Sequence, residues 1–222
     1  MTLFNNIVWH TLVGPHARFT VGNHAVRRYA PGYPPVAAFA DPAAPDLHAL
    51  ARWVRPGEHI YCDGWAGSLP DGWEIDTEGL MLRMVPQDPF ANAATEAVLL
   101  DARHAAAALE LATLTGPGPF TLKTLELGEY FGILDGERLV AMAGSRPCAG
   151  GYSEITGVCT HPDFSGKGLA RQLVAKILLH QRRRGDTPFL RVMQDNAAAV
   201  RLYHRLGFRV AGTSIARVIT RH

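Results

Sequence analysis

A chain of 222 residues, 47% hydrophobic and 19% charged, is long enough to bury a sizeable core, and its formal net charge of +2 lacks the dense basic patch that binds nucleic acid. Three cysteines far apart in the sequence and ten scattered histidines predict no disulfide framework and no metal site. Neither a signal sequence nor a run of about 18 apolar residues is found, so we expect no membrane span and a cytoplasmic location.

Proline, glycine and aspartate break residues 1–78 into short segments. Between these breaks the sequence predicts a strand at 36–40, a helix at 46–54 with Asp46 as its N-cap, and a strand at 59–62. No motif with recognisable chemistry occurs in this part of the chain. We therefore expect it to form a small α/β half without a site of its own.

From residue 79 onward the predicted elements are longer and more regular. A strand is predicted at 80–85, followed by a helix at 102–114 with Asp101 as its N-cap. Gly116, in a Gly-Pro-Gly-Pro segment, ends this helix.

A β-hairpin is predicted between 129–134 and 137–143. The connection Asp135-Gly136 is a strong two-residue turn signal, in which both positions need a positive φ. The hairpin places two antiparallel strands side by side, and the next run, 152–160, predicts a third strand.

Strand 152–160 leads into a helix and a further strand. Its alternation is expected to place Glu154, Val158 and Thr160 on one face. Apolar residues then recur at helical spacing up to Gly185, and a short apolar strand follows at 189–193. The order strand, helix, strand predicts a parallel pair joined by a right-handed crossover.

The last predicted helix spans 196–206, with Asp195 as a candidate N-cap and Gly207 as its stop. Together these elements predict a mixed α/β fold with a largely antiparallel sheet and flanking helices. Because no long Gly/Ser linker occurs, residues 1–78 and 79–222 are expected to be fused halves.

A glycine-bearing turn, Ser165-Gly166-Lys167-Gly168-Leu169-Ala170, precedes the helix that ends near Gly185. Such a turn directs unpaired backbone N–H groups and the positive end of the helix dipole at one point, which is what a pyrophosphate needs. The segment therefore predicts a site for a phosphate-bearing cofactor.

Two nucleotide-binding motifs fit this turn poorly. A Walker P-loop requires glycine where His161 stands, and a magnesium-binding Ser or Thr where Gly168 stands. A dinucleotide GxGxxG motif requires a third glycine at Arg171, and the antiparallel hairpin upstream disagrees with its alternating βαβ context.

The turn resembles instead the acyl-CoA loop of the GNAT superfamily of N-acyltransferases. A second signature of that family lies over Asn196, Ala199, Leu202-Tyr203 and Gly207-Phe208, and His161-Pro162 is the dipeptide common before the loop. The resemblance covers residues 79–222 and implies a GNAT fold, with the N-terminal half as a candidate degenerate copy. Ser165 stands where the family usually has Gln or Arg, a change that a loop binding through backbone N–H groups tolerates.

The resemblance implies acetyl-CoA as the cofactor. Its pantetheine would pair with the backbone of a splayed strand at Val158, Cys159 and Thr160, and Asn196 would contact its amide portion. The pyrophosphate would rest on the loop and the helix start, formed by Ser165, Gly166, Lys167, Gly168, Leu169 and Ala170.

The resemblance further implies transfer of an acetyl group to a primary amine by direct attack in a ternary complex. Tyr203 matches the general acid that protonates the leaving thiolate. Glu154 is the first candidate for the base that deprotonates the amine; His161 and a water relay are alternatives.

The acceptor is expected to be an amine of a small molecule or a peptide, with loops 116–119 and 146–151 shaping its pocket. We expect a monomer or a homodimer. The alternative function is a GNAT-like module that binds acyl-CoA without turnover, which the Ser165 substitution would favour.

Overall fold

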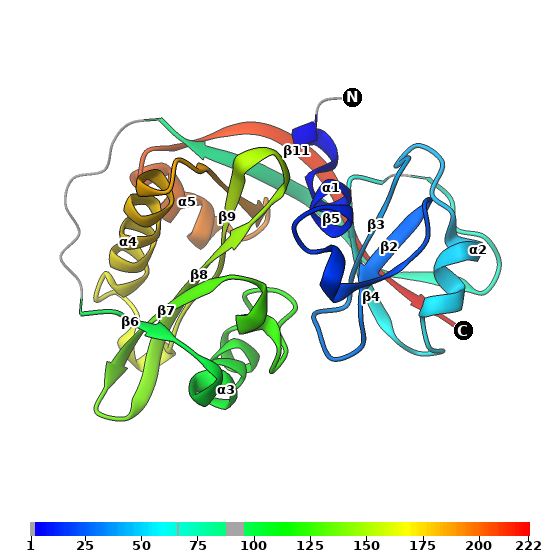
Figure 1. Cartoon of the computed structure of the whole chain (residues 1–222). Helices are drawn as coiled ribbons and strands as arrows, with labels where there is room; N and C mark the ends of the chain where they lie inside the picture. Colours follow the sequence, from blue (N-terminus) through cyan, green and yellow to red (C-terminus); the bar gives the residue numbers. More distant parts are fainter. Residues whose placement is uncertain (1–2, 66, 88–95) are drawn as a thin grey trace.

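A computed structural model describes residues 3–65, 67–87 and 96–222 of the chain (Figure 1). The described strands form one eleven-stranded sheet in the order β1-β2-β3-β4-β11-β5-β10-β9-β8-β7-β6. Their bounds are β1 (Thr20–Gly22), β2 (Val26–Tyr29), β3 (Val36–Phe39), β4 (His59–Asp63), β5 (Trp73–Pro86), β6 (Val98–Leu100), β7 (Glu129–Asp135), β8 (Arg138–Pro147), β9 (Tyr152–Thr160), β10 (Thr187–Met193) and β11 (Phe208–Arg221).

Helices cover this sheet, and most of its strand pairs are antiparallel. The α-helices are α1 (Ile7–Val13), α2 (Leu47–Leu50), α3 (Ala105–Thr115), α4 (Leu169–Arg183) and α5 (Ala197–Arg205). The parallel pairs are β3 with β4 and β9 with β10. A mixed α/β fold with a largely antiparallel sheet and the parallel pair flanking α4 is therefore confirmed.

The two long strands β5 and β11 run through both parts of the molecule (Figure 1). They pair with each other along almost their whole lengths, and the end of β11, residues 216–220, also pairs with β4. The predicted division between residues 78 and 79 thus falls inside β5. The sheet of the N-terminal half therefore includes β11, the last strand of the chain, which lies between β4 and β5.

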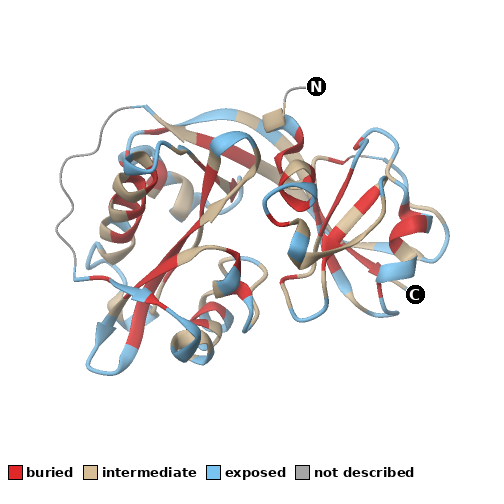
Figure 2. Cartoon of the chain, viewed as in Figure 1, coloured by how far each residue is buried: buried red, intermediate tan, exposed pale blue. Residues whose placement is uncertain are grey.

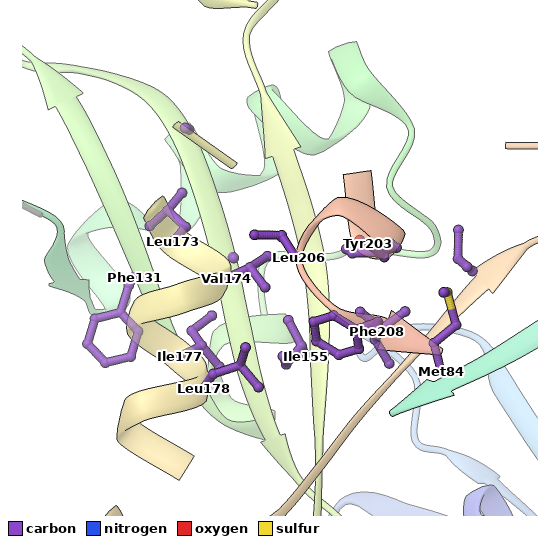
Figure 3. Packing of buried hydrophobic residues seen from close by; sticks show 14 of the residues in the cluster. Met84, Phe131, Ile155, Leu173, Val174, Ile177, Leu178, Tyr203, Leu206 and Phe208 are labelled. Atoms are coloured by element: carbon purple, nitrogen blue, oxygen red, sulfur yellow. The ribbon is translucent and has the colours of Figure 1, made fainter. Parts of the chain in front are cut away.

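Separate hydrophobic cores lie in the two parts of the molecule that the paired strands β5 and β11 connect (Figure 2). Beneath α4 and α5, Leu173, Ile177 and Phe208 pack against Ile155 and Met84 (Figure 3). In the N-terminal half, a second cluster packs α2 onto the sheet and includes Phe39, Leu50, Ile60, Trp65 and Ile219. The amphipathic pattern of α4 explains its position, because its apolar stripe is the buried face.

Two local predictions were wrong. The hairpin turn consists of Gly136-Glu137, because Asp135 pairs with Arg138, and a positive φ occurs at Gly136 but at no described non-glycine residue. Helix α5 is capped by Asn196, not Asp195, since the Asn196 Oδ1 accepts a hydrogen bond from Ala199 N at 3.1 Å. In the ranges that the structure describes, no helix is both long and apolar enough to cross a membrane.

A fragment consisting of residues 1–78 is expected to be unfolded when expressed alone. It lacks β11, which pairs with both β4 and β5, and it loses the fully buried Ile219 from its core. Far-UV circular dichroism and amide chemical-shift dispersion measure this directly. A cooperative unfolding transition of the fragment would contradict the shared-strand architecture, and the full chain is the control.

Candidate active site

The glycine turn leaves the start of α4 open to a ligand. Gly166 and Gly168 have φ of +77° and +78°, and a Cβ added at either would meet nothing within 4 Å, so backbone conformation rather than space requires glycine there. Gly168 is the N-cap of α4 and provides no side-chain cap. The first-turn N–H groups of α4 therefore remain available to an anion.

Strands β9 and β10 diverge beside this turn. They pair in parallel only as far as Ile155 and Leu190, after which β10 continues along β5 to Met193. The predicted splay of β9 over residues 158–160 is thus present. At the end of this segment the hydroxyl of Thr160 is buried, with no hydrogen-bond partner among the described residues.

A β-bulge in β9 changes which side chains share a face. Thr156 pairs with Gly144 and Cys159 with Met142, so Gly157 and Val158 together lie opposite Ala143. The extra residue reverses the alternation, with Gly157 at a φ of +59°.

The bulge overturns the predicted arrangement of Glu154. Val158 lies with Ile155 in the core under α4, whereas Glu154 pairs across the other face with Arg146. The prediction that Glu154 shares a face with Val158 and Thr160 was therefore wrong.

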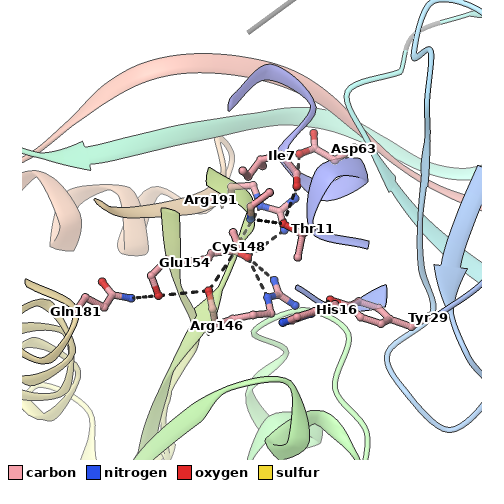
Figure 4. A network of polar contacts seen from close by, with 12 residues as sticks. Ile7, Thr11, His16, Tyr29, Asp63, Arg146, Cys148, Glu154, Gln181 and Arg191 are labelled. Atoms are coloured by element: carbon pink, nitrogen blue, oxygen red, sulfur yellow. Dashed lines mark hydrogen bonds and ion pairs between the residues drawn. The ribbon is translucent and has the colours of Figure 1, made fainter. Parts of the chain in front are cut away.

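Glu154 is the centre of a buried chain of ion pairs (Figure 4). Arg146 contacts its Oε2 through Nε, at 3.2 Å, and through Nη2. Arg191 Nε contacts its Oε1 at 2.8 Å, and Arg191 Nη1 contacts Asp63 Oδ2 on β4 at 2.9 Å. This chain connects β8, β9 and β10 with the N-terminal half.

These ion pairs make Glu154 a poor proton acceptor. Its side chain is 6% exposed. Burial alone would raise the pKa of Glu154, but the charges of Arg146 and Arg191 outweigh this effect and lower the pKa to about 2. A general base works best when its pKa lies near the operating pH. The geometry therefore weighs against Glu154 as the base, a role that remains only a prediction.

Tyr203 and Asn196 lie where α5 borders the splayed strands. Burial, followed by the nearby Cys159 thiol, raises the pKa of Tyr203 to about 12, so its hydroxyl stays protonated at neutral pH. The Asn196 Oδ1 caps α5, whereas its Nδ2 has no hydrogen-bond partner in the described part of the chain. Both side chains line the same cavity.

This cavity, of about 490 Å³, is lined by both halves. It brings Glu154, Val158, Asn196 and Tyr203 together, and its wall includes the predicted loop 116–119. Of loop 146–151, Arg146 is the residue that lines the cavity. Cys159, Thr160 and the turn at 165–170 do not line it. Candidate base His161 lies outside it, hydrogen-bonded to Arg138.

Sequence reasoning missed the partners of Glu154. Arg146, Arg191 and Asp63 come from three different strands, and no local pattern signals their convergence. The isolated Gly157 within a predicted strand was the available signal for the bulge. No group of three or more metal-ligating side chains is found in the residues that the structure describes.

Comparison with known proteins finds relatives in both sequence and fold. The family model described as FR47-like protein matches residues 130–218. A GNAT-family acetyltransferase structure from Novosphingobium aromaticivorans is 30% identical, with a TM-score of 0.88 and complete coverage of both chains. A GCN5-related N-acetyltransferase from Kribbella flavida, 17% identical, shares the fold with a TM-score of 0.60 over 98% of this chain and 94% of its own.

A curated relative matches a shorter segment. The L-methionine sulfoximine/L-methionine sulfone acetyltransferase of Salmonella typhimurium is 38% identical over 60 residues, which is 27% of this chain and 35% of the relative. The match thus spans about a third of that protein. The similarity to the Novosphingobium aromaticivorans protein, at 30% identity over the full length of both chains, establishes that the chain belongs to the GNAT family of acetyltransferases.

Proposed function

We propose that this protein transfers the acetyl group of acetyl-CoA to a primary amine of a small molecule or peptide, by direct attack in a ternary complex. The observation that carries the proposal is the position of Tyr203. Tyr203, whose hydroxyl stays protonated, lines the same cavity as Ile155 and Thr156 of β9, the residues at which β9 and β10 separate.

The residues present fit acetyl-CoA. The uncapped start of α4 and the two left-handed glycines suit a pyrophosphate, and the free edge of β9 at 158–160 suits an amide-bearing chain. The unpartnered Thr160 hydroxyl and Asn196 Nδ2 provide further polar contacts. Acetyl-CoA supplies the activated thioester; the protein supplies orientation and proton control.

Tyr203 serves as the general acid. Burial keeps the phenol neutral at physiological pH, so it holds the proton that a departing thiolate requires. Tyr203 as a whole is 7% exposed, so most of its side chain is shielded from solvent.

The acceptor amine gives its proton to water in the cavity. Glu154 acts as a positioning residue, because it is ionised and its two oxygens are engaged by Arg146 and Arg191. The N-terminal half forms part of the wall on the acceptor side, where Tyr61 and Cys62 line the cavity. We place the reaction in the cytoplasm, where three free cysteines persist in the reduced form.

Thiol release from acetyl-CoA in the presence of a panel of amines tests the proposal. Tyr203→Phe is expected to lower kcat about a hundredfold with little change in the KM for acetyl-CoA, since only proton delivery is lost. Tyr152→Phe, on β9 but outside the cavity lining, is the matched control.

Two outcomes would contradict this assignment. Unchanged thiol release by Tyr203→Phe would remove Tyr203 as the acid. Stabilisation by acetyl-CoA in a thermal unfolding assay, without thiol release for any amine, would favour the binding module that Ser165 suggests.

The pH dependence of kcat/KM is expected to follow the acceptor, not the enzyme. Glu154, with a pKa of about 2, and Tyr203, with a pKa of about 12, both keep one protonation state between pH 6 and 10. Two acceptors with ammonium pKa values of about 8 and about 10 should give rising limbs displaced by about two pH units. One common limb for both acceptors would indicate a base on the protein.

A further inference from the structure

The two arginines that flank Glu154 differ in the hydrogen bonding of Nη1, the guanidinium nitrogen that is not used on Glu154. We call this side of each guanidinium its outer edge. Arg191 uses Nε and Nη2 on Glu154, and its Nη1 is held by Asp63 at 2.9 Å. Arg146 uses the same Nε and Nη2 edge on Glu154. Its Nη1, however, has no anion or other hydrogen-bond partner in the described part of the chain. A guanidinium can bind a second acceptor through this outer edge.

The unpartnered edge of Arg146 opens on the cavity between the halves. Arg146 is part of the cavity lining, and its side chain is 12% exposed. Its Nη1 is not among the buried polar atoms that lack a partner. The Arg146 end of the ion-pair chain therefore carries positive charge that a small ligand can reach.

The side chains around this edge are neutral. Burial is the main cause at each: it raises the pKa of Tyr29 to about 12 and of Cys148 to about 11, and lowers that of His16 to about 4. These groups lie close enough to feel the Arg146 charge. None of them supplies the second anion that Asp63 supplies to Arg191.

Tyr130 offers a second donor to the same cavity. A Cβ at Gly144 would lie 2.4 Å from its Cε1 atom, and one at Gly157 would lie 3.1 Å from it, so these glycines make the space for the ring. The hydroxyl has no hydrogen-bond partner among the described residues, although Tyr130 lines the cavity and is 1% exposed. Burial raises the pKa of Tyr130, which therefore remains a neutral donor.

We propose that the acceptor is a primary amine that also carries a carboxylate, and that this carboxylate binds Arg146 Nη1 and the Tyr130 hydroxyl. The ligand would occupy at Arg146 the place that Asp63 occupies at Arg191. The inference rests on the proposed acetyl transfer and names its substrate class, that of amino acids.

Matched acceptors test this substrate class. A panel of amino acids is compared with their carboxamides and with the corresponding decarboxylated amines, with kcat/KM expressed per unprotonated amine. Calorimetric titration of the same compounds in the presence of coenzyme A measures binding without turnover. The amino acids are expected to exceed both analogues at least about tenfold in affinity and in kcat/KM.

The outcomes separate this inference from the proposed function. Thiol release without preference for the carboxylate, or no binding of any amino acid, would overturn the inference. Selective binding of amino acids without thiol release would support it while contradicting the transfer reaction.

Tyr130→Phe tests the site itself. The hydroxyl makes no hydrogen bond to the described residues, so its removal is not expected to impair folding. The ratio of kcat/KM for an amino acid to that for its carboxamide should fall about tenfold. Tyr152→Phe, which removes a hydroxyl outside the cavity lining, should keep the wild-type ratio.

A second variant tests Arg146 without leaving Glu154 as a buried carboxylate that has lost one partner. Arg146→Gln alone removes one partner of Glu154, so it is combined with Glu154→Gln. The double variant should lose the carboxylate preference. Retention of that preference by both this variant and Tyr130→Phe would contradict the proposed site.

Discussion

The structure depends on the ion pairs that balance the charge of one buried carboxylate, that of Glu154. Glu154 is buried on β9, where an unpaired charge is strongly disfavoured, and Arg146 and Arg191 on the neighbouring strands β8 and β10 keep it ionised. Arg191 extends the chain to Asp63 on β4, so the same electrostatic interaction that satisfies Glu154 also connects the two halves. Removing one partner from such a pair typically costs about 3–5 kcal/mol, because the remaining charge stays buried.

The same ion pairs bear on which catalytic role we propose for each residue that lines the cavity. A carboxylate held by two guanidiniums is a poor proton acceptor at neutral pH, which is why we propose a positioning role for Glu154 in place of base catalysis. In the proposed reaction the proton comes from Tyr203 on α5, which lines the same cavity as Glu154, Arg146 and Arg191. The two arginines differ in a second way: Asp63 pairs with Arg191, while Nη1 of Arg146 is left for the carboxylate of the proposed acceptor.

Local patterns predicted much of this fold, and long-range contacts account for what they missed. The glycine turn, helix α4 and strand β9 follow from spacing within a few residues, and the structure has them at the expected positions. The bulge at Gly157 decides whether Val158 shares a face with Glu154, and the Arg191–Asp63 contact joins residues 128 positions apart. The shared strand β11 is equally non-local, since it is the last strand of the chain and pairs with β4 of the N-terminal half.

A double-mutant cycle on Asp63 and Arg191 tests most directly whether the ion-pair chain holds the halves together. The free energy of unfolding is measured by chemical denaturation for the wild type, Asp63→Asn, Arg191→Gln and the double variant. Both side chains are largely buried, so the account predicts a coupling free energy of about 1–3 kcal/mol. Effects of the two substitutions that add to within about 0.5 kcal/mol would contradict it.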